Sequence, residues 1–101
     1  MAPAKLQEVL ATLRAHEQDL RRFGVRHAAV FGSVARGEDL PASDVDVLVE
    51  LDGDRPIGIF EYARLKLYLD DLLNGTADVA NLRTLKPLLR RSILQDAVHA
   101  F

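Results

Sequence analysis

The segments VFGSVARG (residues 30–37) and SDVDVLV (residues 43–49) carry the strongest structural pattern in this chain. In the second segment, valines alternate with Asp44, Asp46 and Leu48. Alternation with a period of two predicts a strand with one apolar face, and here the opposite face carries two carboxylates. In the first segment an apolar run stops at Gly32-Ser33, which predicts a strand that ends in a turn.

On either side of these segments, helical and extended patterns alternate. In chain order we expect a helix over 3–22, a strand over 25–31, a connection over 32–42 with one helical turn at 33–36, a strand over 44–51, a loop over 52–56, a helix over 58–73, a strand over 77–82 and a last helix. Thr84 is the expected N-cap of the last helix, and Pro87 lies in its first turn. Its expected buried side consists of Leu88, Leu89, Ile93 and Ala97.

This order predicts an α/β (α+β) fold in which a small three-stranded sheet is covered by about four helices. The 101 residues fit one domain over 1–101. With a net charge of -2 the chain lacks the basic excess of a general nucleic-acid binder. The absence of cysteine excludes disulfides and thiolate metal sites. Without a membrane-length apolar run, we expect a cytoplasmic protein with no membrane contact.

The paired carboxylates point to metal chemistry. On a strand, the Cα atoms of Asp44 and Asp46 lie about 6.6 Å apart, so their charges repel and favour a bound cation. Mg²⁺ takes one or two carboxylates together with phosphates and water. Asp78 on a neighbouring strand would complete a site for two ions about 3.5–4 Å apart. The alternative is a half-exposed edge strand for the pair and a turn or capping role for Asp78.

Gly32 and Ser33 have the chemistry of a phosphate-binding turn. Glycine lets a phosphate approach the backbone, and serine offers a hydroxyl and an amide. Arg36 is a candidate partner for a triphosphate. The alternatives are a plain strand-ending turn and a solvated loop arginine.

Together, Gly32-Ser33, the ten-residue gap and Asp44-Val45-Asp46 resemble the signature of the DNA polymerase beta-like nucleotidyltransferase superfamily. The likeness is closest to its minimal nucleotidyltransferase (MNT) branch, and LKPLLRRSIL (residues 85–94) is similar as well. The resemblance implies a nucleotidyltransferase fold with a mixed sheet. It also implies that Gly32 and Ser33 hold the nucleotide phosphates and that Asp44 and Asp46 bind metal ions.

Asp78 resembles the third carboxylate of the family, which helps to deprotonate the acceptor hydroxyl. The family usually shows Val-Asp-Leu-Val at this strand, whereas this chain has Ala77-Asp78-Val79-Ala80. The resemblance further implies two Mg²⁺ ions and ATP as substrate. It also implies that the chain is an antitoxin that transfers AMP to a tyrosine of a HEPN-domain ribonuclease toxin. Two alternatives stay open: a non-catalytic antitoxin that binds its toxin, and a stand-alone transferase acting on RNA or a small molecule.

Other polar and apolar groups leave further choices. Lys86, Arg90 and Arg91 could meet a phosphate or the acidic surface of a partner, or form a solvated helix face. The leucines of the helix over 58–73 are expected in the core, with a partner interface as the alternative. The three histidines lack metal-ligand spacing.

Overall fold

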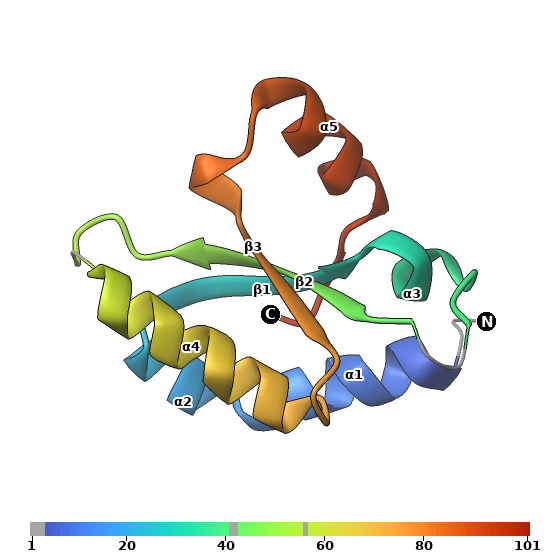
Figure 1. Ribbon diagram of the computed structural model, residues 1–101, viewed down its shortest axis with the longest axis horizontal. Coiled ribbons are helices and arrows are strands. Elements are labelled where there is room, and N and C mark those ends of the chain that lie inside the picture. Colours follow the sequence, from blue (N-terminus) through green and yellow to red (C-terminus); the bar gives the residue numbers. More distant parts are fainter. Residues whose placement is uncertain (1–3, 41–42, 56) are drawn as a thin grey trace.

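The computed structural model describes residues 4–40, 43–55 and 57–101 (Figure 1). Pro3, Ala42 and Pro56, which bounded predicted segments, lie outside the described residues. The elements are α1 (Ala4–Ala15), α2 (Glu17–Arg22), β1 (Val25–Phe31), α3 (Gly32–Arg36), β2 (Val45–Leu51), α4 (Ile59–Leu72), β3 (Ala77–Asn81), the 3-10 turn η1 (Leu82–Thr84), α5 (Pro87–Asp96) and β4 (Val98–His99). This order confirms the predicted alternation of helices and strands.

The strands form one mixed sheet in the order β3-β2-β1-β4. β1 pairs antiparallel with β2 and β4, whereas β2 and β3 run parallel. The prediction of three strands was therefore one short within the described residues. The additional strand pairs Val98 with Val30 and His99 with Ala29. Two residues are too few to produce a recognisable period-two pattern, which explains the omission.

The two faces of the sheet are covered by different helices, as Figure 1 shows: α1, α2 and α4 lie on one side and α5 on the other. Val45, Val47 and Val49 of β2 are buried in the larger core, with leucines of α1 and α4. Leu48 faces the other way and packs with Ala29 of β1 and Ile93 of α5. Asp46 shares the face of Leu48, because residues two apart on a strand point to the same side. The predicted apolar back and carboxylate-bearing front are thus confirmed.

The predicted long first helix is divided into two. α1 ends at Ala15 and α2 begins at Glu17, while His16 between them has φ -109° and ψ 18°. The Nδ1 atom of His16 lies 2.9 Å from the carbonyl oxygen of Thr12. The break falls at His16 and Glu17, two polar residues that interrupt the apolar positions of the predicted helix. The two helices still place Leu13 and Leu20 in one core.

α4 begins one residue later and ends one residue earlier than predicted. The backbone N–H of Gly58 donates to the Glu61 carboxylate, which closes the start of the helix. Leu65 and Leu69 are fully buried, as expected. Leu67 was also expected in the core, yet it is 70% exposed, because it lies on the opposite side of the helix.

The last helix differs most from its prediction. Thr84 is not its N-cap but belongs to η1, where its hydroxyl donates to the Asn81 carbonyl at 3.2 Å. Ile93 is buried, as predicted, whereas Ala97 is only half-buried and lies just after the end of the helix. Leu88 and Leu89, by contrast, are 83% and 53% exposed. The helix covers the sheet with its C-terminal half, so the leucines of its first turn extend beyond the sheet.

Replacing Leu65 by alanine should lower the free energy of unfolding by about 2–5 kcal/mol, because the substitution leaves a cavity in the core. Leu67→Ala, two residues along the same helix, should change it by less than about 0.5 kcal/mol. Urea unfolding followed by circular dichroism measures both. Equal losses would contradict the assigned orientation of α4.

Candidate active site

The carboxylates of Asp46 and Asp78 meet on neighbouring strands. In the parallel pairing of β2 with β3, Asp46 is the register partner of Asp78. Directly opposed residues point to the same face of a sheet, so both side chains lie on the face that α5 partly covers. Asp44 precedes β2, two residues before Asp46. Asp78 thus lies beside Asp46 although residues 77–80 depart from the pattern that is usual in the resembled family.

The turn after β1 lies directly against Asp46. Phe31, the last residue of β1, is the register partner of Asp46, and Gly32 follows with φ +73°. A Cβ atom at position 32 would overlap the carboxylate of Asp46. Glycine is therefore needed here both for its left-handed backbone and for the space it leaves. The turn and the aspartates occupy the same side of the sheet, as the sequence predicted.

α3 places Ser33 and Arg36 beside this turn. Ser33 is half-buried in the first turn of α3, where backbone N–H groups lack helical partners. The guanidinium of Arg36 donates to Glu38 at 3.0 Å and to Asp96 at 2.6 Å. These hydrogen bonds raise the pKa of Arg36, first through Glu38 and then through Asp96. Both carboxylates compete with any phosphate for Arg36, and its predicted role as a nucleotide ligand stays a prediction.

Asp46 is the electrostatic centre of the group. Burial raises its pKa above the ordinary value of 3.8, and the negative charges of Asp78 and Asp44 raise it further. A hydrogen bond with Asp78 acts in the same direction, whereas the positive charge of Arg36 lowers the pKa. The charges of Asp44, Asp78 and Arg36 thus all act on the carboxylate of Asp46. A bound cation would relieve the repulsion among the three carboxylates.

The donor set fits a magnesium ion that shares its coordination with a substrate. Within the part of the chain that the structure describes, no three His, Cys, Asp or Glu side chains are arranged to hold a metal ion by themselves. Mg²⁺ usually takes only one or two carboxylates and fills its other positions with phosphate oxygens and water. Asp46 and Asp78 provide such a pair, and Asp44 adds negative charge nearby.

Asp96 is the site residue that sequence analysis missed. It lies 60 positions after Arg36 and reaches it only because α5 folds back over the sheet. No local spacing rule could have paired the two residues.

Across the described ranges, no helix is both long and apolar enough to cross a bilayer.

Known proteins share both the sequence and the fold. Residues 13–99 match the family model of the nucleotidyltransferase domain. The chain is 38% identical over 100 residues to "Protein adenylyltransferase MntA" of Thermococcus cleftensis, covering 98% of this chain and 99% of that protein. A solved candidate minimal nucleotidyltransferase is 40% identical with a TM-score of 0.70, covering 88% of this chain and 93% of the other.

A more distant structure shares the fold. It is a tri-AMPylated Shewanella oneidensis HEPN toxin in complex with an MNT antitoxin. The matching chain has a TM-score of 0.64 and 16% identity, and the match covers 91% of this chain and 71% of that one.

Asp46→Asn should raise the free energy of unfolding at neutral pH in buffer containing EDTA. The raised pKa of Asp46 means that the folded state holds its proton up to a higher pH than the unfolded state does. Wild-type stability therefore falls as pH rises through the window that begins at the unfolded pKa. The gain in stability from asparagine should be largest above this window and should disappear only below pH 3.8, where the carboxylate is protonated in both states. Chemical unfolding across pH measures it. Asp71→Asn is the control. If Asp46→Asn exceeds the stability of wild type by the same amount at every pH, the proposed repulsion of Asp46 by its neighbouring carboxylates is wrong.

Gly32→Ala should destabilise the protein more than Gly75→Ala by about 1–3 kcal/mol, the usual cost of overpacking. Both glycines have similar positive φ values, +73° and +79°, so the backbone strain is matched. No atom lies within 4 Å of a Cβ at position 75, whereas Asp46 would overlap one at position 32. In an Asp46→Ala background the two substitutions should become nearly equal. A difference that persists there would show that Asp46 is not the obstacle.

Proposed function

This chain belongs to the nucleotidyltransferase domain family, and from that premise we propose that it transfers AMP from ATP to a hydroxyl group on a protein. The close packing of the Gly32 turn against Asp46, with Asp78 alongside, is the observation that supports a nucleotide site here. A phosphate chain at this turn would lie between backbone N–H groups and the carboxylates. The name of the Thermococcus relative, a protein adenylyltransferase, supports AMP as the transferred group.

The proposed acceptor is a tyrosine of a HEPN-domain ribonuclease toxin, and the chain is its antitoxin. The Shewanella complex supports this pairing, because it is described as an AMPylated HEPN toxin bound to an MNT antitoxin.

Each site residue has a part in the proposed transfer. Gly32 and Ser33 bind the phosphates through the backbone and the serine hydroxyl. Asp44, Asp46 and Asp78 would hold the Mg²⁺ ions together with phosphate oxygens and water, and the likeness to the superfamily implies two ions. Bound Mg²⁺ would neutralise phosphate charge and lower the pKa of the acceptor hydroxyl.

The acceptor oxygen forms a bond to the α-phosphorus of ATP, and the bond to the departing pyrophosphate breaks. Asp78 lies on the edge strand of the sheet and accepts the proton of the acceptor hydroxyl. Arg36 offsets charge on the pyrophosphate once it exchanges Glu38 or Asp96 for a phosphate oxygen.

Transfer should depend on all three carboxylates. With α-labelled ATP, Mg²⁺ and a HEPN-domain toxin as the acceptor, wild type should label that protein. Asp78→Asn should slow labelling by about 100-fold or more, because the general base is lost. The Asp44→Asn plus Asp46→Asn variant should abolish labelling.

The matched control is Asp71→Asn, which removes an exposed carboxylate at the end of α4. Wild-type labelling by the Asp44→Asn plus Asp46→Asn variant would refute the metal-site assignment. If that variant labels nothing and still neutralises the toxin fully, the chain acts as a binding antitoxin.

A further inference from the structure

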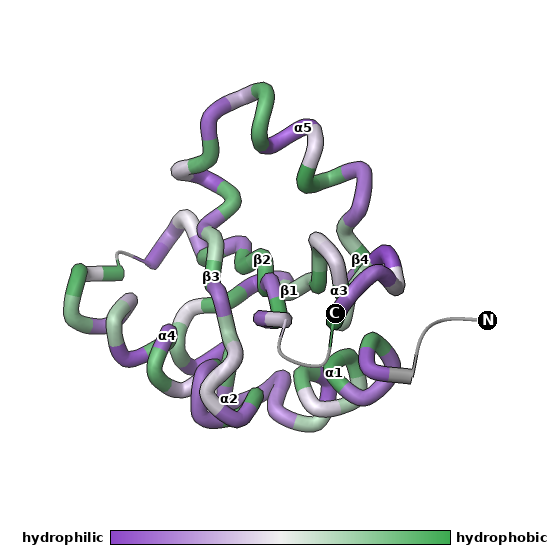
Figure 2. The backbone as a smooth tube through the Cα atoms, turned by 45° about the vertical axis from the view of Figure 1, so that its right-hand side comes forward, coloured by the Kyte–Doolittle hydropathy of each residue, from purple (hydrophilic) through white to green (hydrophobic). Residues whose placement is uncertain are grey.

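The exposed side of α5 combines apolar and basic side chains. Leu88, Leu89 and Leu94 are 83%, 53% and 45% exposed. A groove beside them is lined by Leu85, Pro87, Arg90, Arg91, Leu94 and Gln95. Figure 2 shows hydrophobic and hydrophilic segments alternating along this helix, which projects from the rest of the molecule. We call the following residues the α5 surface: Lys86, Leu88, Leu89, Arg90, Arg91 and Leu94.

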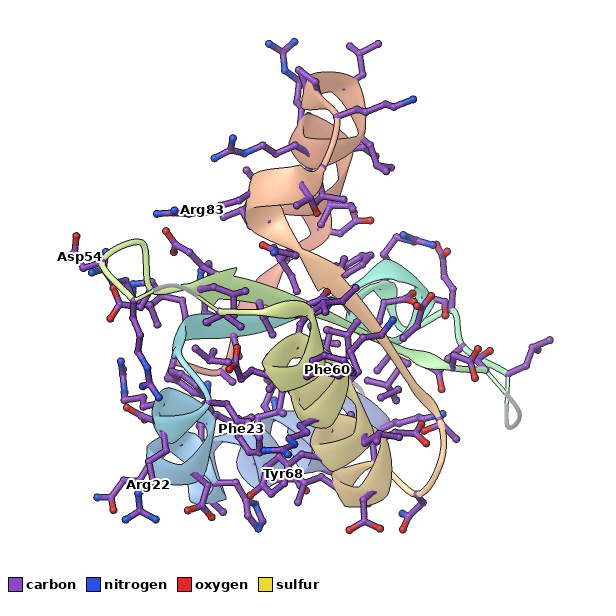
Figure 3. All side chains as sticks on the ribbon, turned by 60° about the vertical axis from the view of Figure 1, so that its left-hand side comes forward. Arg22, Phe23, Asp54, Phe60, Tyr68 and Arg83 are labelled. Atoms are coloured by element: carbon purple, nitrogen blue, oxygen red, sulfur yellow. The ribbon has the colours of Figure 1, made fainter. Side chains whose placement is uncertain are left out.

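The charges of the α5 surface are unbalanced. The chain has 15 acidic and 13 basic residues, yet residues 84–95 contain three basic residues and no acidic one. None of the ion pairs within the described ranges includes Lys86, Arg90 or Arg91. Arg83 does not contribute, because its guanidinium lies against Gly53, and Figure 3 shows it near the loop of Asp54. The α5 surface is therefore complementary to an acidic partner.

α5 is joined to the candidate active site at its C-terminal end. There Asp96 binds Arg36 of α3, the helix that begins at Gly32. At its other end, η1 connects α5 to β3, the strand that carries Asp78 near its start. A molecule bound along α5 toward Asp96 would therefore reach the Arg36 side of the site.

A second exposed apolar area, on α4, has a different position. Ile59, Phe60 and Leu67 are exposed there, but α4 packs on the face of the sheet opposite the carboxylates. Its charges are also mixed, because Glu61, Asp70 and Asp71 accompany Arg64 and Lys66. The α4 area is therefore neither on the side of the candidate active site nor uniformly basic.

Three exposed leucines among the cations favour a protein over a nucleic acid. Single-stranded nucleic acids are bound by basic grooves with aromatic residues on which bases stack. α5 contains no aromatic residue. Protein interfaces, in contrast, combine an apolar centre with arginine and a polar rim.

We propose that the α5 surface binds the protein that carries the acceptor hydroxyl, through a segment whose apolar side chains are flanked by Asp or Glu. This inference rests on the proposed function, in which the acceptor is a protein. Leu88 and Leu94 share one side of the helix with Arg91 and form the apolar centre of the contact, and Leu89 extends it around the helix. Lys86, Arg90 and Arg91 orient the acidic partner. The α5 surface thereby presents the hydroxyl to the site and governs the KM for the acceptor rather than ATP binding.

Two variants test the proposal with the same HEPN-domain toxin as the acceptor. One is Arg90→Glu plus Arg91→Glu, and the other is Leu88→Ser plus Leu89→Ser. The matched control, Arg64→Glu plus Lys66→Glu, makes the same change of charge on α4. Each α5 variant should bind the HEPN-domain protein at least about tenfold more weakly in calorimetry and raise its KM in labelling to a similar extent. Binding of Mg²⁺ with ATP, followed by the rise in melting temperature, should equal that of wild type and show that the site is intact.

Wild-type binding and KM in both α5 variants would overturn the proposal, as would equal losses in the control. The proposal would also be overturned if the wild-type chain bound the HEPN-domain protein through neither α5 nor α4. If Arg90→Glu plus Arg91→Glu abolishes only the binding of a labelled single-stranded RNA, or only self-association in sedimentation, the α5 surface serves RNA or a second copy. If wild type forms the complex through α5 but labels nothing, the proposed function fails while the surface assignment stands.

Discussion

The negative charge gathered around Asp46 is the constraint on which this structure depends. Strand pairing places Asp78 beside Asp46, and Asp44 comes two residues earlier, so the charges of both carboxylates act on Asp46. Burial of apolar side chains offsets this cost on the reverse of the same strand, where Val45, Val47 and Val49 are enclosed by helices. The buried valines on one face of β2 thus stabilise the fold, whereas the carboxylates on the other face destabilise it. Burial of the valines fixes the strand that carries the carboxylates. The absence of a side chain at Gly32 leaves room for the carboxylate.

Local pattern was enough to predict the elements around this strand. β1 has the bounds expected from an apolar run that ends at Gly32, and the single turn of α3 follows it. The same-side placement of the Gly32 turn, Asp46 and Asp78 could also be predicted. It follows from period-two alternation and from the likeness to a known family. These features depend on neighbours in sequence or on adjacent strands.

Features that depend on distant parts of the chain escaped prediction. β4 is a strand only because β1 offers it an edge, and Asp96 joins the site only through the fold of α5. The apolar pattern of α5 could not distinguish Ile93, which meets the sheet, from Leu88, which meets solvent. Helical periodicity identifies an apolar side of a helix but not how far along the helix its neighbour extends. The same ambiguity explains Leu67 on α4.

The ion pair between Arg36 and Asp96 has a consequence for the order in which the protein matures on the ribosome. The turn at Gly32 and the strand that carries Asp46 are synthesised long before Asp96, which follows Arg36 by 60 residues. Until α5 has emerged and folded back, the guanidinium lacks one of its two carboxylate partners. Nascent chains thus contain the acidic strand early, whereas the surroundings of Arg36 are completed only about 60 residues later in synthesis.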